Sequence, residues 1–101
     1  MSLKVRQYLQ KLKRDFPLRK PVSVRIREVV RSDDGSDLYG TCCDGGERFQ
    51  IVIASHADES VMCDSLFHEW CHAILWPKCS VRHTDLFFKT YGMIYRHYLD
   101  D

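Results

Sequence analysis

The stretch that decides the fold is residues 66–73, LFHEWCHA, which contains the pattern H-E-x-x-H at His68, Glu69 and His72. The residues around it have the character of a helix, and two side chains four residues apart lie on one face of a helix. His68 and His72 can therefore bind one Zn²⁺ together, and Glu69 stands beside them to accept a proton from a water at the metal. The pattern predicts a helical zinc site with its own general base.

The helix that carries this motif is predicted to run from Asp58 to Trp76. Asp58 or Ser60 could cap its first turn, where acidic side chains also interact favourably with the helix dipole. Pro77 ends the helix, because proline disfavours helical geometry in the residue before it.

Hydrophobic periodicity predicts the other elements. Apolar residues at helical spacing and alternating apolar residues indicate two more helices and three strands. The predicted order is a helix over residues 3–16, strands over residues 22–27, 38–43 and 49–54, the motif helix, and a last helix from about His83 to Leu99. Polar residues 32–37 and the glycine-rich residues 44–46 are predicted turns. This order indicates one α+β domain over residues 1–101, with a mainly antiparallel three-stranded sheet.

Composition restricts the class of protein. The 101 residues are 45% hydrophobic, an ordinary value for a globular core, and contain no apolar run of the length that a membrane span needs. The N-terminal residues lack the apolar stretch of a signal peptide, so we expect a cytoplasmic protein that does not associate with membranes. The five cysteines include no C-x-x-C pair and are expected to be reduced thiols. Cys71, inside the motif, is expected to be buried and not a ligand.

The small net charge of +1 conceals an asymmetry along the chain. Residues 1–31 carry ten Lys and Arg against two acids, whereas residues 32–69 carry nine acids against one base, Arg48. A basic segment of this kind could contact nucleic acid or an acidic partner. The simpler interpretation, which we favour, is a solvated helix face together with one polar strand face.

A catalytic zinc usually has three protein ligands, and the third must follow His72. No glutamate lies C-terminal to Glu69, and Lys78 occupies the place where metzincins have their third histidine. The candidates that remain are His83, Asp85, His97 and Cys79. We favour His83, because a turn between antiparallel helices would return it to the motif helix. Asp85 is the next choice, or could instead orient a ligand histidine.

These motifs resemble the small SprT-like zincins, a family with phage-encoded members. Residues 66–73 match the metalloprotease signature of that family, and residues 83–87, HTDLF, match its third histidine with an aromatic residue four positions later. Tyr91, Tyr95 and Arg96 continue as in the phage-type members, whereas Thr84 replaces a common glycine. The resemblance implies a zincin-like α+β fold over residues 1–101 and a zinc metallopeptidase with a protein or peptide substrate. It also implies that residues 50–54 form an open sheet edge along which the substrate lies.

In this interpretation His68, His72 and His83 hold Zn²⁺ and Glu69 is the general base. Tyr91 or Tyr95 could donate a hydrogen bond to the oxyanion, although a core aromatic role is the simpler expectation for each. His56 could line the cleft. Two alternatives stay open: a non-catalytic zinc-binding adaptor, closed by a fourth ligand such as Cys79 or Asp85, and a nucleic-acid-associated domain that uses the basic N-terminal segment.

Overall fold

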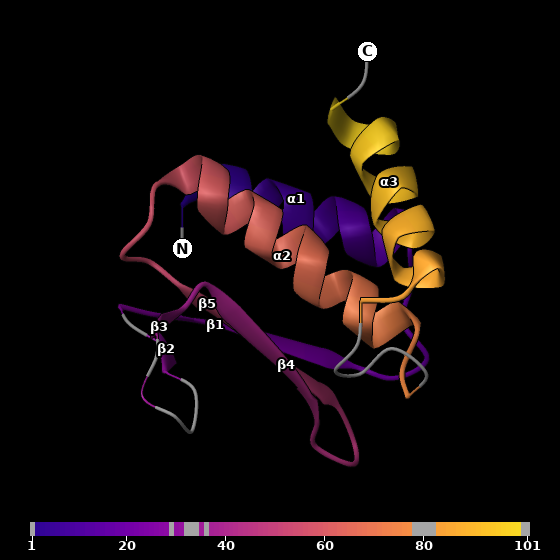
Figure 1. Ribbon diagram of the computed structural model, residues 1–101, viewed down its shortest axis with the longest axis horizontal. Coiled ribbons are helices and arrows are strands. Elements are labelled where there is room, and N and C mark those ends of the chain that lie inside the picture. The colour runs from indigo at the N-terminus through magenta and orange to yellow at the C-terminus, as the bar shows by residue number, and fades with distance from the viewer. Residues whose placement is uncertain (1, 29, 32–34, 36, 78–82, 100–101) are drawn as a thin grey trace.

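The computed structural model describes residues 2–28, 30–31, 35, 37–77 and 83–99 (Figure 1). The described residues form a small α+β fold of two layers, in which the helices lie on one side of a three-stranded sheet. The helices are α1 (Leu3–Asp15), α2 (Glu59–Ile74) and α3 (Asp85–Leu99). The strands are β1 (Val22–Arg27), β2 (Val30–Arg31), β3 (Asp37–Leu38), β4 (Gly40–Asp44) and β5 (Phe49–Ala54).

The sheet is mixed, so the prediction of a mainly antiparallel sheet is wrong in this respect. Its strand order is β1-β5-β4, with β1 parallel to β5 and β4 antiparallel to β5. The hairpin from β4 to β5 turns through Gly46, whose φ of 92° favours glycine, as predicted for this turn. Because β1 pairs with the second strand of this hairpin, β5 is the central strand and β4 is an edge.

Burial explains why β5 takes the central position. Its inward-facing residues Phe49, Ile51 and Ile53 are all fully buried beneath the helices. The prediction that residues 50–54 form an open edge is therefore wrong, since both sides of β5 are paired. The predicted strand over residues 38–43 is also divided, because Leu38 pairs with Val30 in a separate two-stranded ribbon. Most of the predicted polar turn lies outside the described residues.

Local signals in the sequence explain where the helices begin and end. The Ser2 side chain accepts a hydrogen bond from the Val5 amide at the start of α1, and the Asp58 side chain accepts one from the Val61 amide at the start of α2. These caps satisfy amides that have no partner inside the helix. Helix α3 begins two residues later than predicted, because the Thr84 hydroxyl accepts from the Phe87 amide and caps it.

One hydrophobic core joins the helices to the sheet. Trp70 of α2 is fully buried, and its indole nitrogen donates to the carbonyl oxygen of Phe16, 2.9 Å away. This hydrogen bond ties the motif helix to the segment just after α1. Tyr98 of α3 also reaches Phe16 and packs against Phe67 of α2 and Tyr8 of α1. Helix α2 is therefore held between its two neighbouring helices.

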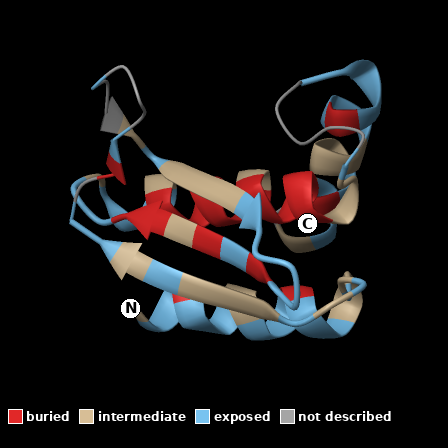
Figure 2. Cartoon of the chain, turned by 90° about the horizontal axis from the view of Figure 1, so that it is seen from below, coloured by how far each residue is buried: buried red, intermediate tan, exposed pale blue. Residues whose placement is uncertain are grey.

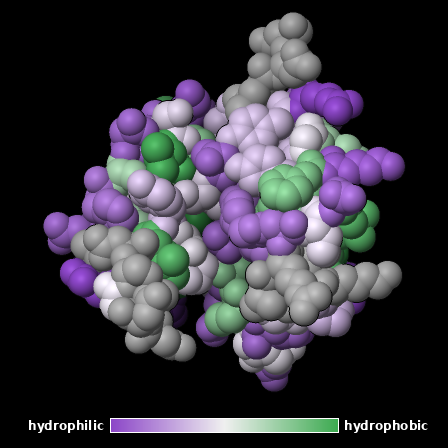
Figure 3. All heavy atoms as spheres, viewed as in Figure 1, coloured by the Kyte–Doolittle hydropathy of each residue, from purple (hydrophilic) through white to green (hydrophobic). Residues whose placement is uncertain are grey.

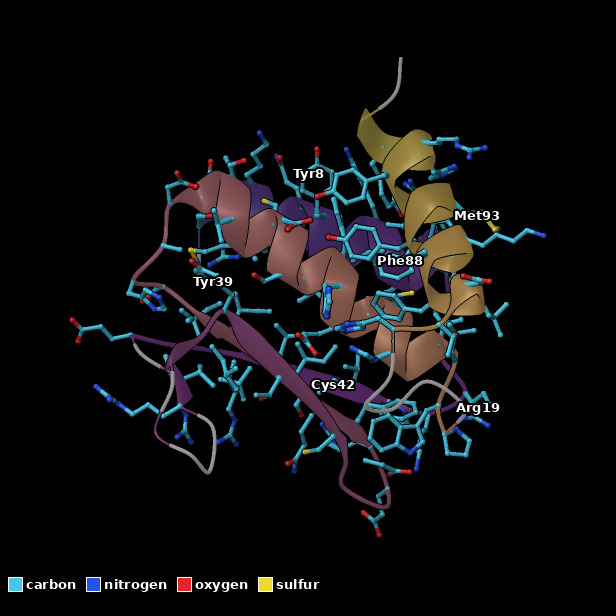
Figure 4. The ribbon with its side chains drawn as sticks, viewed as in Figure 1. Tyr8, Arg19, Tyr39, Cys42, Phe88 and Met93 are labelled. Atoms are coloured by element: carbon cyan, nitrogen blue, oxygen red, sulfur yellow. The ribbon has the colours of Figure 1, made fainter. Side chains whose placement is uncertain are left out.

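Exposed apolar side chains do not merge into one surface in the view of Figure 3, where hydrophobic residues form small groups among hydrophilic ones. Phe88 and Met93 of α3 are more than half exposed. Met93 points away from α2 on the outer side of α3 (Figure 4). None of the helices in the described ranges has both the length and the apolar character that crossing a membrane would require.

Candidate metal centre

Three histidine side chains converge beside the C-terminal half of α2. His68 and His72 come from α2, and His83 comes from the segment just before α3. The Nε2 atom of His83 lies 3.1 Å from that of His68 and 3.3 Å from that of His72. The Nε2 atoms of His68 and His72 are themselves 3.3 Å apart. The structure thus brings together the three residues that the sequence predicted as metal ligands.

The spacing of these nitrogens fits a metal ion. Zinc–nitrogen bonds of about 2.0–2.1 Å at tetrahedral angles place two ligand nitrogens roughly 3.3–3.4 Å apart. The three separations, from 3.1 to 3.3 Å, are close to this value. A neutral imidazole has one nitrogen that donates and one that accepts. If the three Nε2 atoms are all acceptors, they cannot form hydrogen bonds with one another. A cation at their centre would satisfy all three lone pairs at once.

Phe87 forms the floor beneath the three rings. Its ring centroid lies 5.0 Å from that of His68, 4.6 Å from that of His72 and 4.7 Å from that of His83. Phe87 is fully buried, and its amide is the one capped by Thr84. Because this cap starts α3 after His83, His83 lies outside the helix and can turn towards α2. The sequence motif includes Phe87, four positions after His83, but does not predict its contact with all three histidine rings.

The electrostatics of the cluster favour the neutral form of His68. Burial, together with the proximity of His72 and His83, lowers the pKa of His68 to about 4, because a second positive charge nearby is unfavourable. At neutral pH the His68 ring is therefore uncharged. A neutral imidazole is the form that offers a lone pair to a metal.

Glu69 follows the first histidine directly and lies against the edge strand. Its side chain is buried, and burial raises the pKa of Glu69 to about 7. A Cβ added at Gly40 of β4 would stand 3.2 Å from Cγ of Glu69 and 3.3 Å from its Oε2. Glycine at position 40 thus lets the edge strand approach this carboxylate closely.

Gly40 and Cys42 of β4 lie near Glu69, and the sequence alone did not predict either of them as part of the site. Gly40 pairs with Ile53 and Cys42 pairs with Ile51, so both share the inward face of the sheet with these isoleucines. Burial, together with the nearby Glu69, raises the pKa of Cys42 to about 12. Figure 4 shows Cys42 between β4 and the C-terminal half of α2. The predicted hairpin and the alternation of Ile51 and Ile53 were the signals that could have placed both residues here.

Tyr91 and Tyr95 connect α3 to α2. Both hydroxyls donate hydrogen bonds to Oδ1 of Asp64, which lies one helical turn before His68. Their rings stack 5.0 Å apart, and the Tyr91 ring lies 5.7 Å from that of His68. Burial and the bond to Asp64 raise the pKa of Tyr95 to about 12 and also raise the pKa of Tyr91. The structure places the Tyr91 ring next to His68 and the Tyr95 ring against that of Tyr91, one turn further along α3, and their role as oxyanion donors stays a prediction.

The other candidates lie elsewhere. Nε2 of His97 is 3.2 Å from Asp15, near the end of α1. Asp85 is exposed at the start of α3 and is not part of the histidine cluster, and Cys79 lies outside the described residues. Cys71 is fully buried as predicted, and its thiol donates to the Phe87 carbonyl. His56 stacks on the exposed Tyr39.

No family model, no curated protein and no solved structure matches this chain. The features of the site are three clustered histidines, a buried glutamate beside them and an edge strand against that glutamate.

Proposed function

We propose that the protein is a zinc-dependent metallopeptidase of the zincin type, similar to the SprT-like zincins. The observation that supports this proposal is the convergence of three Nε2 atoms at the separations of a tetrahedral site, next to a buried glutamate. Three neutral imidazoles favour Zn²⁺ over harder ions such as Mg²⁺ or Ca²⁺. A site with three protein ligands leaves one position open, which is typical of catalytic zinc centres.

When bound, zinc would polarise a carbonyl oxygen and lower the pKa of water. The residues of the chain would do the rest. Glu69 would accept a proton from the attacking water and pass it to the amine that leaves. Its burial suits this role, because a carboxyl group with a pKa of about 7 can both gain and lose a proton near neutral pH.

The open edge of β4 is the part of the sheet that we propose aligns the substrate. Within the described part of the chain, β4 pairs only with β5, so its outer edge can accept an extended peptide as a further strand. Gly40 lies on this strand against Glu69. A peptide added to β4 would therefore pass beside the general base. Phe88, an exposed aromatic residue whose ring lies 6.2 Å from that of His83, offers an apolar contact on the α3 side.

Glu69→Gln tests the proposal. Glutamine has nearly the same shape but cannot accept the proton, so hydrolysis should fall by about 10²–10⁴-fold while bound zinc and stability change little. The matched control is Glu59→Gln, the same substitution at an exposed position on the first turn of α2, which should keep wild-type activity. The assay measures cleavage of an unfolded protein at equal zinc occupancy.

Two results would contradict the proposal. Wild-type activity in Glu69→Gln would mean that Glu69 is not the base. A zinc-loaded wild type that cleaves no faster than Glu69→Gln would favour the adaptor, in which the metal only holds the fold together.

A further inference from the structure

The charged side chains on the face of the sheet opposite the helices are all positive. Figure 2 shows this outer face, with β5 between β4 and β1. Side chains of successive residues alternate between the two faces of a sheet, and residues paired across strands share a face. The outward residues are therefore Ser23, Arg25 and Arg27 of β1, Gln50, Val52 and Ala54 of β5, and Thr41 and Cys43 of β4. None of these eight residues is acidic.

A hollow of about 390 Å³ lies on this face and is lined largely by basic and polar side chains. Arg25 and Arg27 line it from β1, and Arg48 lines it from the residue before β5. A guanidinium nitrogen of Arg48 donates to the Ser23 hydroxyl, 2.9 Å away, which holds the Arg48 side chain across the boundary between the two strands. Three arginines thus border one concave surface.

These arginines are not balanced by nearby acids. All three are exposed, and within the described part of the chain no carboxylate forms an ion pair with Arg25, Arg27 or Arg48. Ordinary solvated surfaces mix charges of both signs, and like charges that face one another across a sheet destabilise it. Three like charges around one hollow therefore point to an anionic ligand.

We propose that this outer face binds the phosphate backbone of a nucleic acid. Arginine forks form paired hydrogen bonds with phosphate oxygens, and Arg25 and Arg27, two residues apart on a strand, are spaced by about 6.6 Å along an extended ligand. The residues that line the hollow include no aromatic side chain, so it has no aromatic ring on which bases could stack, and this favours contact with the backbone.

The composition of the face favours nucleic acid over an acidic protein. Protein interfaces are built around buried aromatic or large apolar anchors, whereas nucleic-acid interfaces are polar and positively charged. The apolar side chains directed outwards from β5 are Val52, which is half-buried, and the small Ala54, which is buried, so neither is an exposed apolar anchor. The metal centre lies on the helix side of the sheet, so this surface is separate from it and does not depend on the proposed peptidase function.

The basic residues of the N-terminal segment lie on two different sides of the sheet. Helix α1 packs on the helix side, where Val5 and Leu12 enter the core, while Arg25 and Arg27 lie on the outer face. This separation supplies a matched control. The variant Arg25→Gln/Arg27→Gln/Arg48→Gln removes three charges from the outer face, and Lys4→Gln/Arg6→Gln/Lys13→Gln removes three exposed charges from α1.

Fluorescence anisotropy with labelled single-stranded and duplex DNA of random sequence, between 50 and 200 mM salt as an approximate range, tests the proposal. Loss of three phosphate contacts should reduce the slope of log K against log salt by about 2 for single strands and about 3 for duplex. This corresponds to roughly a 100-fold loss of affinity, or more, near 0.1 M salt. The α1 variant should lose only a few-fold, and Glu69→Gln should bind like the wild type. Circular dichroism and zinc content confirm that each variant is folded.

Three results would overturn the proposal. The first is equal loss of affinity in both triple variants, which would indicate only a general attraction between charges. The second is the absence of binding to either DNA at the lowest salt concentration. The third is tighter binding of a poly-glutamate peptide than of DNA, which would make the partner an acidic protein segment.

Discussion

Tyr91→Phe should lower the free energy of unfolding by about 1.5 kcal/mol. The hydroxyls of Tyr91 and Tyr95 both donate to the Asp64 carboxylate, which fastens α3 to α2. A hydrogen bond to a charged group contributes about 1.5–3 kcal/mol, and the lower end applies because all three side chains are only half-buried. The phenylalanine ring would keep its packing against His68, so the loss is that of the hydrogen bond alone.

Urea unfolding of the zinc-loaded and metal-free protein measures this change. For a domain of this size, 1.5 kcal/mol corresponds to a fall in Tm of roughly 6–12 °C. The double variant Tyr91→Phe/Tyr95→Phe should lose about 3 kcal/mol, since the carboxylate then has neither donor. Tyr39→Phe, at an exposed tyrosine on the β4 side, is the matched control and should change stability by less than about 0.5 kcal/mol.

The outcome for activity separates two roles of the tyrosines. If their hydroxyls hold α3 in place, activity per bound zinc in Tyr91→Phe should stay within a few-fold of the wild type. A fall in kcat of about 10²–10³-fold with unchanged stability would instead identify an oxyanion donor and refute the reasoning from Asp64.

Two further predictions concern the ligands and the edge strand. His83→Ala should weaken zinc binding by more than about 100-fold in a competition titration. His97→Ala should leave zinc binding unchanged, because His97 contacts Asp15 far from the cluster. Equal losses in the two variants would show that His83 is not the third ligand. Gly40→Ala should lower both stability, by about 1 kcal/mol, and activity, because its Cβ would stand 3.1 Å from the Val52 carbonyl oxygen and 3.2 Å from Cγ of Glu69. Gly92→Ala, in open space on α3, should instead stabilise the protein by about 0.5–1 kcal/mol in thermal unfolding, and opposite signs would show that the loss at Gly40 comes from its crowded surroundings.

The two candidate ligands in the motif, His68 and His72, could be predicted because the spacing between them is a local property of the sequence. The spacing of His68 and His72 places them on one helix face whatever the rest of the chain does. His83 was the preferred candidate for the third ligand, but the choice depends on how α3 packs against α2. The buried contact of Phe87 with all three rings, together with the Thr84 cap, settles that packing. Neither contact follows from sequence spacing.

The order of the strands could not be predicted in the same way. Alternation in residues 49–54 indicates a strand but does not say which strands lie on either side of it. Parallel pairing of β1 with β5 is a tertiary choice that moves β5 to the centre and leaves β4 as the edge beside Glu69. The role of Asp64 was missed for a related reason, since its two hydrogen-bond donors are 27 and 31 residues away in the sequence.

Zinc X-ray absorption spectroscopy on protein of known metal content tests the three-histidine site. We expect close to one zinc per chain, with three histidine nitrogens and one oxygen at about 2.0–2.1 Å. Less than about a tenth of an equivalent of zinc in folded protein after reconstitution would contradict this proposal. A sulfur ligand at about 2.3 Å would contradict it equally, because it would mean that a cysteine thiolate completes the site.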